Sequence, residues 1–220
     1  RKSKIKSAQR LLGVVARPRA GRYMKWMSVF DDELKEPLYT DSFRQETQGA
    51  NATGILENWF KRANGIGVVD TLLLTDQMTY LPNDLLVKVD IATMAVSLEA
   101  RSPFLDHKVI EFAASLPQNL KLRRLTGKYL LKKVLRKLLP SENLTRRKMG
   151  FGVPIGHWFR GKMQPFLREV ILSEKALGRG LFKPEAVRQL VDLHVRAERD
   201  YSHQLWTLLM LELWFNRFID

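Results

Sequence analysis

The 220-residue chain contains no cysteine, which excludes disulfide bonds, cysteine-ligated metal sites and a cysteine nucleophile within it. Its four histidines show no metal-ligand spacing such as HExxH. The most apolar stretch, 205–219, is too short to cross a bilayer comfortably and contains Glu212 and Arg217. No unbroken apolar segment follows the basic start, so no signal peptide is visible. We expect a cytoplasmic protein without a membrane span, in which 205–219 forms a buried helix.

Acidic residues are absent from two long tracts of a chain whose formal net charge is +14. Residues 1–22 carry eight Lys or Arg, and residues 121–137 carry another eight. Such tracts suit phosphate-bearing partners, namely nucleic acid, nucleotides or an anionic membrane surface. The alternative interpretation is a set of solvated helix faces. The charge alone does not choose between these interpretations.

Strict strand alternation is also rare, whereas apolar residues recur at helical spacing in several segments. Residues 85–96 are predicted to form a helix with Asn83 or Asp84 as its N-cap. Asp106 is predicted to cap a further helix that ends before Pro117. Other helices are expected at 128–139, 155–171, 184–195 and 202–218. The sequence therefore predicts a mainly helical fold.

One connecting loop, 97–106, places charged residues between two apolar segments. Glu99 and Arg101 are expected to be partly buried there, and a buried carboxylate needs a partner such as Arg101. In a structural interpretation this pair fixes the turn and Asp106 only caps a helix. In a functional interpretation Glu99 is a base or an orienting group, and Asp106 faces a divalent cation. Both interpretations stay open on local sequence.

A second loop, 146–156, combines cations with glycines. Glycine allows close backbone approach, and flexible backbone N–H groups beside cations form a good site for phosphate or pyrophosphate. The alternative is a basic surface turn. The residues concerned are Arg146, Arg147, Lys148, Gly150, Gly152 and Gly156.

Three segments together resemble the C-terminal half of the asparagine synthetase domain. They are YLPNDLLVKVDIATMAVSLEARSPFLDHKVIEFAASLP (80–117), TGKYLLKKVL (126–135) and RRKMGFGVPIGHW (146–158). More narrowly, the chain resembles bacterial glutamine-dependent asparagine synthetase-like amidotransferases, including those associated with exopolysaccharide and exosortase systems. The resemblance implies that 23–220 form the helical C-terminal part of an α/β ATP-pyrophosphatase domain of the PP-loop, adenine nucleotide α-hydrolase-like class. Residues 1–22 would then be a basic linker or a remnant of the upstream nucleotide-binding part.

The sequence departs from this family in three respects. The family has a glutaminase domain with a cysteine nucleophile and an SGGxDS loop that grips pyrophosphate, and this chain has neither cysteine nor SGG. We therefore expect the chain alone to be inactive as a synthetase, with exposed hydrophobic faces that permit self-association. Ile91 follows Asp90 where relatives commonly have arginine, which puts any role of that cation in doubt.

The resemblance implies amide formation in two steps that use ATP and Mg²⁺. A carboxylate, aspartate in the parent family, attacks the α-phosphorus of ATP and releases pyrophosphate. Ammonia from a glutaminase domain then displaces AMP from the acyl-adenylate. By their match to family motifs, Glu99 would be the general base and Lys148 would stabilise charge at phosphorus, while Asp106 would orient magnesium. The expected orienting residues are Arg101, Arg147 and Gly150.

Two other functions remain open at this stage. A basic helical module that binds nucleic acid would explain the charge but neither unusual loop, so we expect no specific nucleic acid partner. A related adenylating enzyme that forms a lactam internally would need no ammonia.

Overall fold

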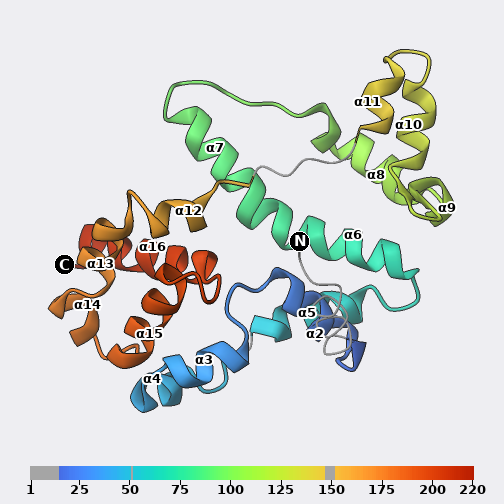
Figure 1. The fold of residues 1–220 in the computed structure, drawn as a ribbon. Coiled ribbons are helices and arrows are strands. Elements are labelled where there is room, and N and C mark those ends of the chain that lie inside the picture. Colours follow the sequence, from blue (N-terminus) through green and yellow to red (C-terminus); the bar gives the residue numbers. More distant parts are fainter. Residues whose placement is uncertain (1–14, 51, 147–151) are drawn as a thin grey trace. The chain divides into compact units, whose positions relative to one another are not determined.

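Residues 15–50, 52–146 and 152–220 are described by a computed structural model, in which the chain divides into two units (Figure 1). We call them the C-terminal unit, with described residues 15, 22–50 and 152–220, and the central unit, with described residues 16–21 and 52–146. The expectation of a mainly helical fold is confirmed, since the described residues contain only one short pair of strands. The expected boundary at residue 22 stays a prediction.

Helices make up the C-terminal unit, and several of them confirm the sequence pattern. The helix expected at 184–195 is α15, and the one expected at 202–218 is α16. The expected single helix 155–171 is wrong, because it is interrupted after Arg160. Pro165 lies in the first turn of the following helix, where its ring and missing N–H prevent a helix from continuing through it. The helices are α3 (Asp32–Leu38), α4 (Asp41–Glu46), α12 (Ile155–Arg160), α13 (Gln164–Ile171), α14 (Glu174–Gly178), α15 (Pro184–Val195) and α16 (Ser202–Phe218). A further helix, α2 (Arg19–Met27), begins in the central unit's residues and ends in those of the C-terminal unit.

The hydrophobic core of the C-terminal unit lies where α12, α13, α15 and α16 pack together. Phe159 and Leu167 are completely buried, and the Phe159 ring stacks on Trp206 with 6.3 Å between the ring centres. The expectation that 205–219 forms a buried helix is correct for one face of α16 only, because Trp214 is about half exposed and Phe218 is 68% exposed. The buried apolar residues are Leu38, Phe159, Leu167, Ile171, Val187, Val191, Leu205, Leu208 and Leu209.

Two segments distant in sequence meet beside this core. The N–H of Lys183 donates to the carbonyl of Leu38 at 2.8 Å, and the N–H of Thr40 donates to that of Leu181 at 3.1 Å. The rings of Tyr39 and Phe182 lie 5.8 Å apart. These contacts attach α3 and α4 to the segment before α15.

The central unit contains short helices and one hairpin. Its elements are α5 (Ala52–Arg62), α6 (Val68–Met78), the π-helix η1 (Leu81–Leu86), α7 (Val87–Met94), the 3-10 turn η2 (Pro103–Leu105), α8 (His107–Ser115), α9 (Gln118–Lys121), β1 (Leu122–Arg123), β2 (Thr126–Gly127), α10 (Tyr129–Leu135) and α11 (Ser141–Thr145). The hairpin β1–β2 was not predicted, since two-residue strands are too short to show alternation.

The start of the helix expected at 85–96 is wrong. The chain is already helical at Leu81, and η1 runs directly into α7. Asn83 and Asp84 therefore lie inside helical structure, where no free helix N-terminus needs a cap. The side-chain amide of Asn83 instead donates to the carbonyl of Thr79 at 2.8 Å.

Little of the central unit is buried. None of the residues 76–146 is buried, and the apolar side chains of α7 and of the residues just after it are largely exposed. Ile91 is 65% exposed and Val96 is 73% exposed. The expectation of bare hydrophobic faces is confirmed, whereas self-association stays a prediction.

Candidate functional site

The loop 97–106 begins at a Schellman motif that ends α7. Ser97 has a φ of 59°, in the left-handed region. Its N–H donates to the carbonyl of Met94, and the N–H of Leu98 donates to that of Thr93, both at 3.0 Å. These two bonds satisfy carbonyls that the end of a helix otherwise leaves free. The motif therefore fixes the direction in which the loop leaves α7.

Glu99 and Arg101 form the pair that the sequence predicts. The Nε and a terminal nitrogen of Arg101 each lie 2.8 Å from Oε1 of Glu99. In a non-helical segment, side chains two residues apart can lie on the same side of the backbone. The expectation of partial burial is wrong, because 65% of the Glu99 side chain and 83% of the Arg101 side chain are exposed. An ion pair as exposed as this one contributes little to stability.

Asp106 caps α8 as predicted. Its Oδ1 accepts the N–H groups of Lys108 at 2.9 Å and Val109 at 3.4 Å. These bonds satisfy two of the free N–H groups at the helix start. No bond to its Oδ2 is found among the described residues, so that oxygen is available to a further partner. The capping role and a role toward a cation are therefore compatible.

The three charged residues of the loop line one open hollow of about 780 Å³. Asp90 of α7 lines the same hollow as the turn η2 and the loop. Asp90 is not among the site residues that the sequence predicts. A charged residue on a mainly apolar helix, nine residues before Glu99, could have drawn attention to it. Helical spacing alone does not show whether such a residue faces a site or water. The hollow thus joins three carboxylates and one guanidinium.

A magnesium ion fits this hollow only with help from a substrate. Among the described residues, no group of three or more His, Asp or Glu could hold a metal ion. Mg²⁺ is commonly bound by one or two carboxylates together with substrate phosphates and waters. The available Oδ2 of Asp106 suits that kind of binding.

The second loop can be followed only in part. Arg147, Lys148 and Gly150 lie outside the described residues, and their roles stay predictions. Arg146 ends α11 and is exposed, while Gly156 lies in α12.

His194 of α15 holds Gly156 in place. Its Nδ1 accepts the N–H of Tyr201 at 3.2 Å, so Nε2 carries the proton and donates to the carbonyl of Gly156 at 3.3 Å. Burial, and then the Arg160 guanidinium, lower the pKa of His194, against the weaker opposing effects of the Gly156 bond and Asp200. The imidazole is therefore kept neutral as a structural link. Sequence reasoning did not single out this residue.

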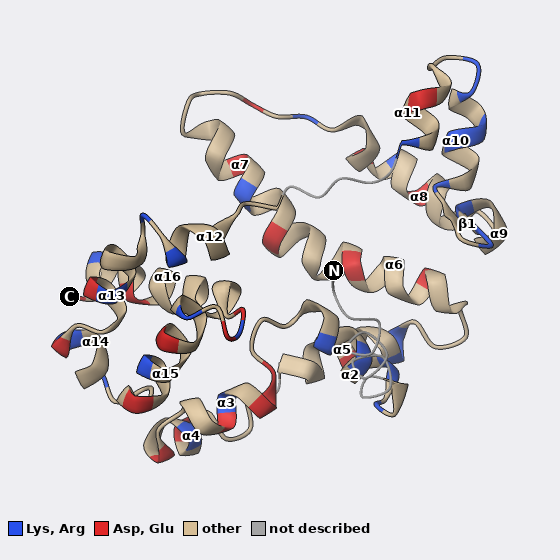
Figure 2. Ribbon diagram, viewed as in Figure 1, with Lys and Arg blue, Asp and Glu red and all other residues tan. Residues whose placement is uncertain are grey.

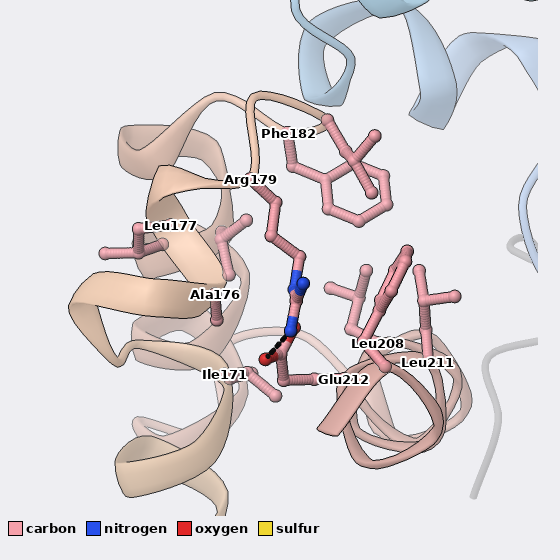
Figure 3. A pocket seen from close by; sticks show the side chains of 11 residues that line it. Ile171, Ala176, Leu177, Arg179, Phe182, Leu208, Leu211 and Glu212 are labelled. Atoms are coloured by element: carbon pink, nitrogen blue, oxygen red, sulfur yellow. Dashed lines mark hydrogen bonds and ion pairs between the residues drawn. The ribbon is translucent and has the colours of Figure 1, made fainter. Parts of the chain in front are cut away.

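A second cavity lies in the C-terminal unit, where Arg179 and Glu212 face each other (Figure 3). Nε of Arg179 lies 2.7 Å from Oε2 of Glu212, and a terminal nitrogen lies 2.8 Å from Oε1. The same guanidinium contacts Asp220 at 2.6 Å and lies 4.2 Å from the centre of the Phe215 ring. The cavity holds about 20 Å³, which is room for about one water molecule. This ion pair is therefore structural, and the cavity is no substrate site.

Comparison with known proteins identifies the class. The model of the asparagine synthase family matches residues 3–216, which is nearly the whole chain. The chain therefore belongs to the asparagine synthase family. The match begins nearer the N-terminus than residue 23, where the resemblance seen in the sequence begins.

The chain spans less than a third of the length of two relatives that it matches. It is 30% identical over 197 residues to asparagine synthetase [glutamine-hydrolyzing] 1 of Bacillus subtilis, covering 90% of this chain and 30% of the relative. It is 40% identical over 146 residues to a putative asparagine synthetase [glutamine-hydrolyzing] of Mycobacterium tuberculosis, covering 66% of this chain and 22% of the relative. No solved structure matches the chain. Within its described residues, no helix has the length and apolarity needed to cross a membrane.

Proposed function

We propose that this chain is the helical part of an ATP-dependent amidotransferase. The enzyme adenylates a carboxylate, aspartate in the parent family, and amidates it with ammonia from glutamine, releasing pyrophosphate and AMP. The observation that supports the proposal is the hollow in which Glu99, Arg101 and Asp106 come together. Membership of the asparagine synthase family supports the reaction class.

Glu99 is the general base of the amide step in this proposal. Attack by ammonia requires the loss of a proton, which a carboxylate accepts when it lies within hydrogen-bonding reach. Both bonds from Arg101 go to Oε1, so Oε2 is available to the ammonia. The guanidinium also limits the rotation of the carboxylate. Arg101 is therefore a positioning residue.

The remaining site residues of this proposal would act on the phosphates of ATP. Attack at the α-phosphorus develops negative charge on the phosphate oxygens. Lys148 would stabilise this charge, a role that its match to the family's loop lysine supports. Arg147 and Gly150 would orient the same phosphates. Asp106 would contribute its Oδ2 to a magnesium ion, which neutralises phosphate charge when bound. We infer that the 220-residue chain alone forms no asparagine.

The test compares two reactions in a polypeptide that joins this chain to a glutaminase domain and a pyrophosphate loop. Lys148→Ala should lose ATP–pyrophosphate exchange by roughly 10²–10³. Glu99→Gln should depress amide formation more than exchange, because only the amide step moves that proton. Glu111→Gln, an exposed change on α8, serves as the matched control.

The alternative is that the two loops are only structural. Exchange and amide formation would then fall together, in proportion to the folded fraction measured by thermal unfolding. A well-folded Lys148→Ala enzyme with normal exchange would remove that lysine from the mechanism. Asparagine formed by the chain alone would remove the need for the other parts.

A further inference from the structure

The hairpin β1–β2 and α10 carry a surface to which the proposed function assigns no residue. We call residues 121–139 the basic hairpin surface. Its first seventeen residues contain eight Lys or Arg and no acid. Figure 2 shows these cations along the hairpin and α10. All of them except Lys121 and Lys132 are exposed.

Two of the eight cations are already occupied within the central unit. Nζ of Lys121 lies 2.7 Å from Oδ1 of Asp70. A terminal nitrogen of Arg123 donates to the hydroxyl of Tyr129 at 2.6 Å, and its guanidinium lies 5.1 Å from the centre of that ring. These contacts tie the hairpin to α6 and α10. No ion pair is found among the described residues for the other six: Arg124, Lys128, Lys132, Lys133, Arg136 and Lys137.

An apolar side chain projects from the middle of this charge. Leu125, at the tip of the hairpin, is 100% exposed. The flanking cations Arg124 and Lys128 both have a φ of 55°, a left-handed conformation that is uncommon for residues other than glycine. A hairpin tip held in this way presents its leucine between cations rather than against the protein.

The end of α10 and the turn after it repeat the same combination. Val134 is 57% exposed and Leu138 is 72% exposed, while Lys133, Arg136 and Lys137 are exposed around them. Exposed apolar residues occur elsewhere in the central unit, as at Ile91, but there without a tract of cations. Cations and bare apolar side chains coincide on this surface.

We propose that the basic hairpin surface docks on an anionic phospholipid membrane. Cations near such a surface are attracted to its headgroups, and exposed leucine and valine enter the boundary between headgroups and acyl chains. A nucleic acid would satisfy the cations but would leave Leu125 and Leu138 in water. Single-stranded nucleic acid also favours aromatic platforms, and the one aromatic residue here, Tyr129, is held by Arg123. The combination therefore fits a lipid surface better than a polynucleotide.

The experiment measures cosedimentation of the 220-residue chain with vesicles. The vesicles are phosphatidylcholine alone, or phosphatidylcholine and phosphatidylserine in equal parts. We expect binding only to the anionic vesicles, and less of it as salt is raised. This measurement involves no catalysis, so its outcome is independent of the proposed amidotransferase activity.

Variants separate the two contributions. Arg124→Asn with Lys128→Asn removes two cations while placing asparagine, which tolerates positive φ, at both positions. Binding should fall about fivefold for each cation removed. Leu125→Ser keeps the charge and should weaken binding by about tenfold. The control, Lys162→Gln with Arg188→Gln, removes two exposed cations from the C-terminal unit and should leave binding nearly unchanged.

Three results would overturn the proposal. The first is equal binding to neutral and anionic vesicles, or binding to neither. The second is an equal loss in the control pair, which would reduce the effect to net charge. The third is tighter binding to duplex DNA that Leu125→Ser leaves unchanged, which would assign the surface to nucleic acid.

Discussion

The two units of this chain are built from similar amphipathic helices but bury them very differently. In the C-terminal unit, nine apolar side chains from several helices form one buried cluster. In the central unit, no residue between 76 and 146 is buried, although α7 and α10 are rich in leucine, isoleucine and valine. Apolar content therefore does not determine burial. What determines it is whether a second element covers the apolar face.

The ion pairs of the two units differ in exposure in the same way as their apolar side chains. In the C-terminal unit the side chains of Arg179 and Glu212 are 14% and 7% exposed, whereas Arg101 and Glu99 are mostly exposed. An ion pair shielded from water interacts more strongly and leaves a costly unpaired charge when one partner is removed. Position within a unit thus decides whether an ion pair is structural or is available for chemistry.

The largest expected effect contrasts two phenylalanines. Phe159→Ala removes a completely buried ring and should lower the free energy of unfolding by about 3–5 kcal/mol. Phe112→Ala, at a position that is 63% exposed, should change it by less than about 0.5 kcal/mol. Denaturant unfolding followed by far-ultraviolet circular dichroism measures both, because both units are built mainly of helices. Equal losses would mean that Phe112 is covered in solution.

The second effect contrasts two glutamates. Glu212→Gln weakens two short bonds to Arg179 in a nearly buried position, and should cost about 2 kcal/mol. Glu99→Gln weakens an exposed pair and should cost between 0 and about 1 kcal/mol. Urea unfolding of the two variants gives the difference. A large loss for Glu99→Gln would show that the loop 97–106 is covered in solution.

Sequence reasoning predicted what depends on local chemistry. The cap at Asp106, the pair of Glu99 with Arg101, and the helices 184–195 and 202–218 all follow from spacing and capping residues. Each of these features depends on neighbours within a few positions. Local sequence patterns therefore predicted these contacts and helices correctly.

The errors concern features that neighbours do not determine. Burial of the loop 97–106 depends on what packs over it, which helical spacing does not reveal. The link from His194 to Gly156 joins residues thirty-eight positions apart in the chain. The π-helix at Leu81 places Asn83 inside a helix although its residue type favours a cap. Asp90 lines the hollow together with Glu99 and Asp106, which follow it by nine and sixteen positions.

A third prediction concerns the pH dependence that His194 gives to the stability of the C-terminal unit. Its pKa is lowered in the folded state from 6.5, so the unfolded chain binds the proton first as pH falls. Stability is then fully present above about pH 6.5 and decreases below it, by at most about 1.4 kcal/mol per pH unit. His194→Asn should remove this slope, since asparagine can accept the N–H of Tyr201 without binding a proton.

The control for this prediction is His203→Asn, which changes an exposed histidine on α16 and should leave the slope in place. Urea unfolding at several pH values between 5 and 8 gives the slope for each variant. A slope that survives His194→Asn would assign the pH dependence to another group.

The smallest expected effect comes from Asp220, whose carboxylate contacts Arg179 at 2.6 Å and Lys175 at 3.0 Å. Hydrogen bonds from Arg179, and then from Lys175, lower its pKa from 3.8 to about 2. A carboxyl group with a lowered pKa stabilises the fold above its unfolded value, and this contribution is lost as pH falls from about 4 toward about 2. Asp220→Asn should therefore reduce the acid sensitivity of the C-terminal unit in that range. Asp41→Asn, at a side chain that is 82% exposed, should not. Fluorescence of Trp206 during acid titration distinguishes the two, and identical titrations for both variants would show that the Asp220 contacts contribute nothing in solution.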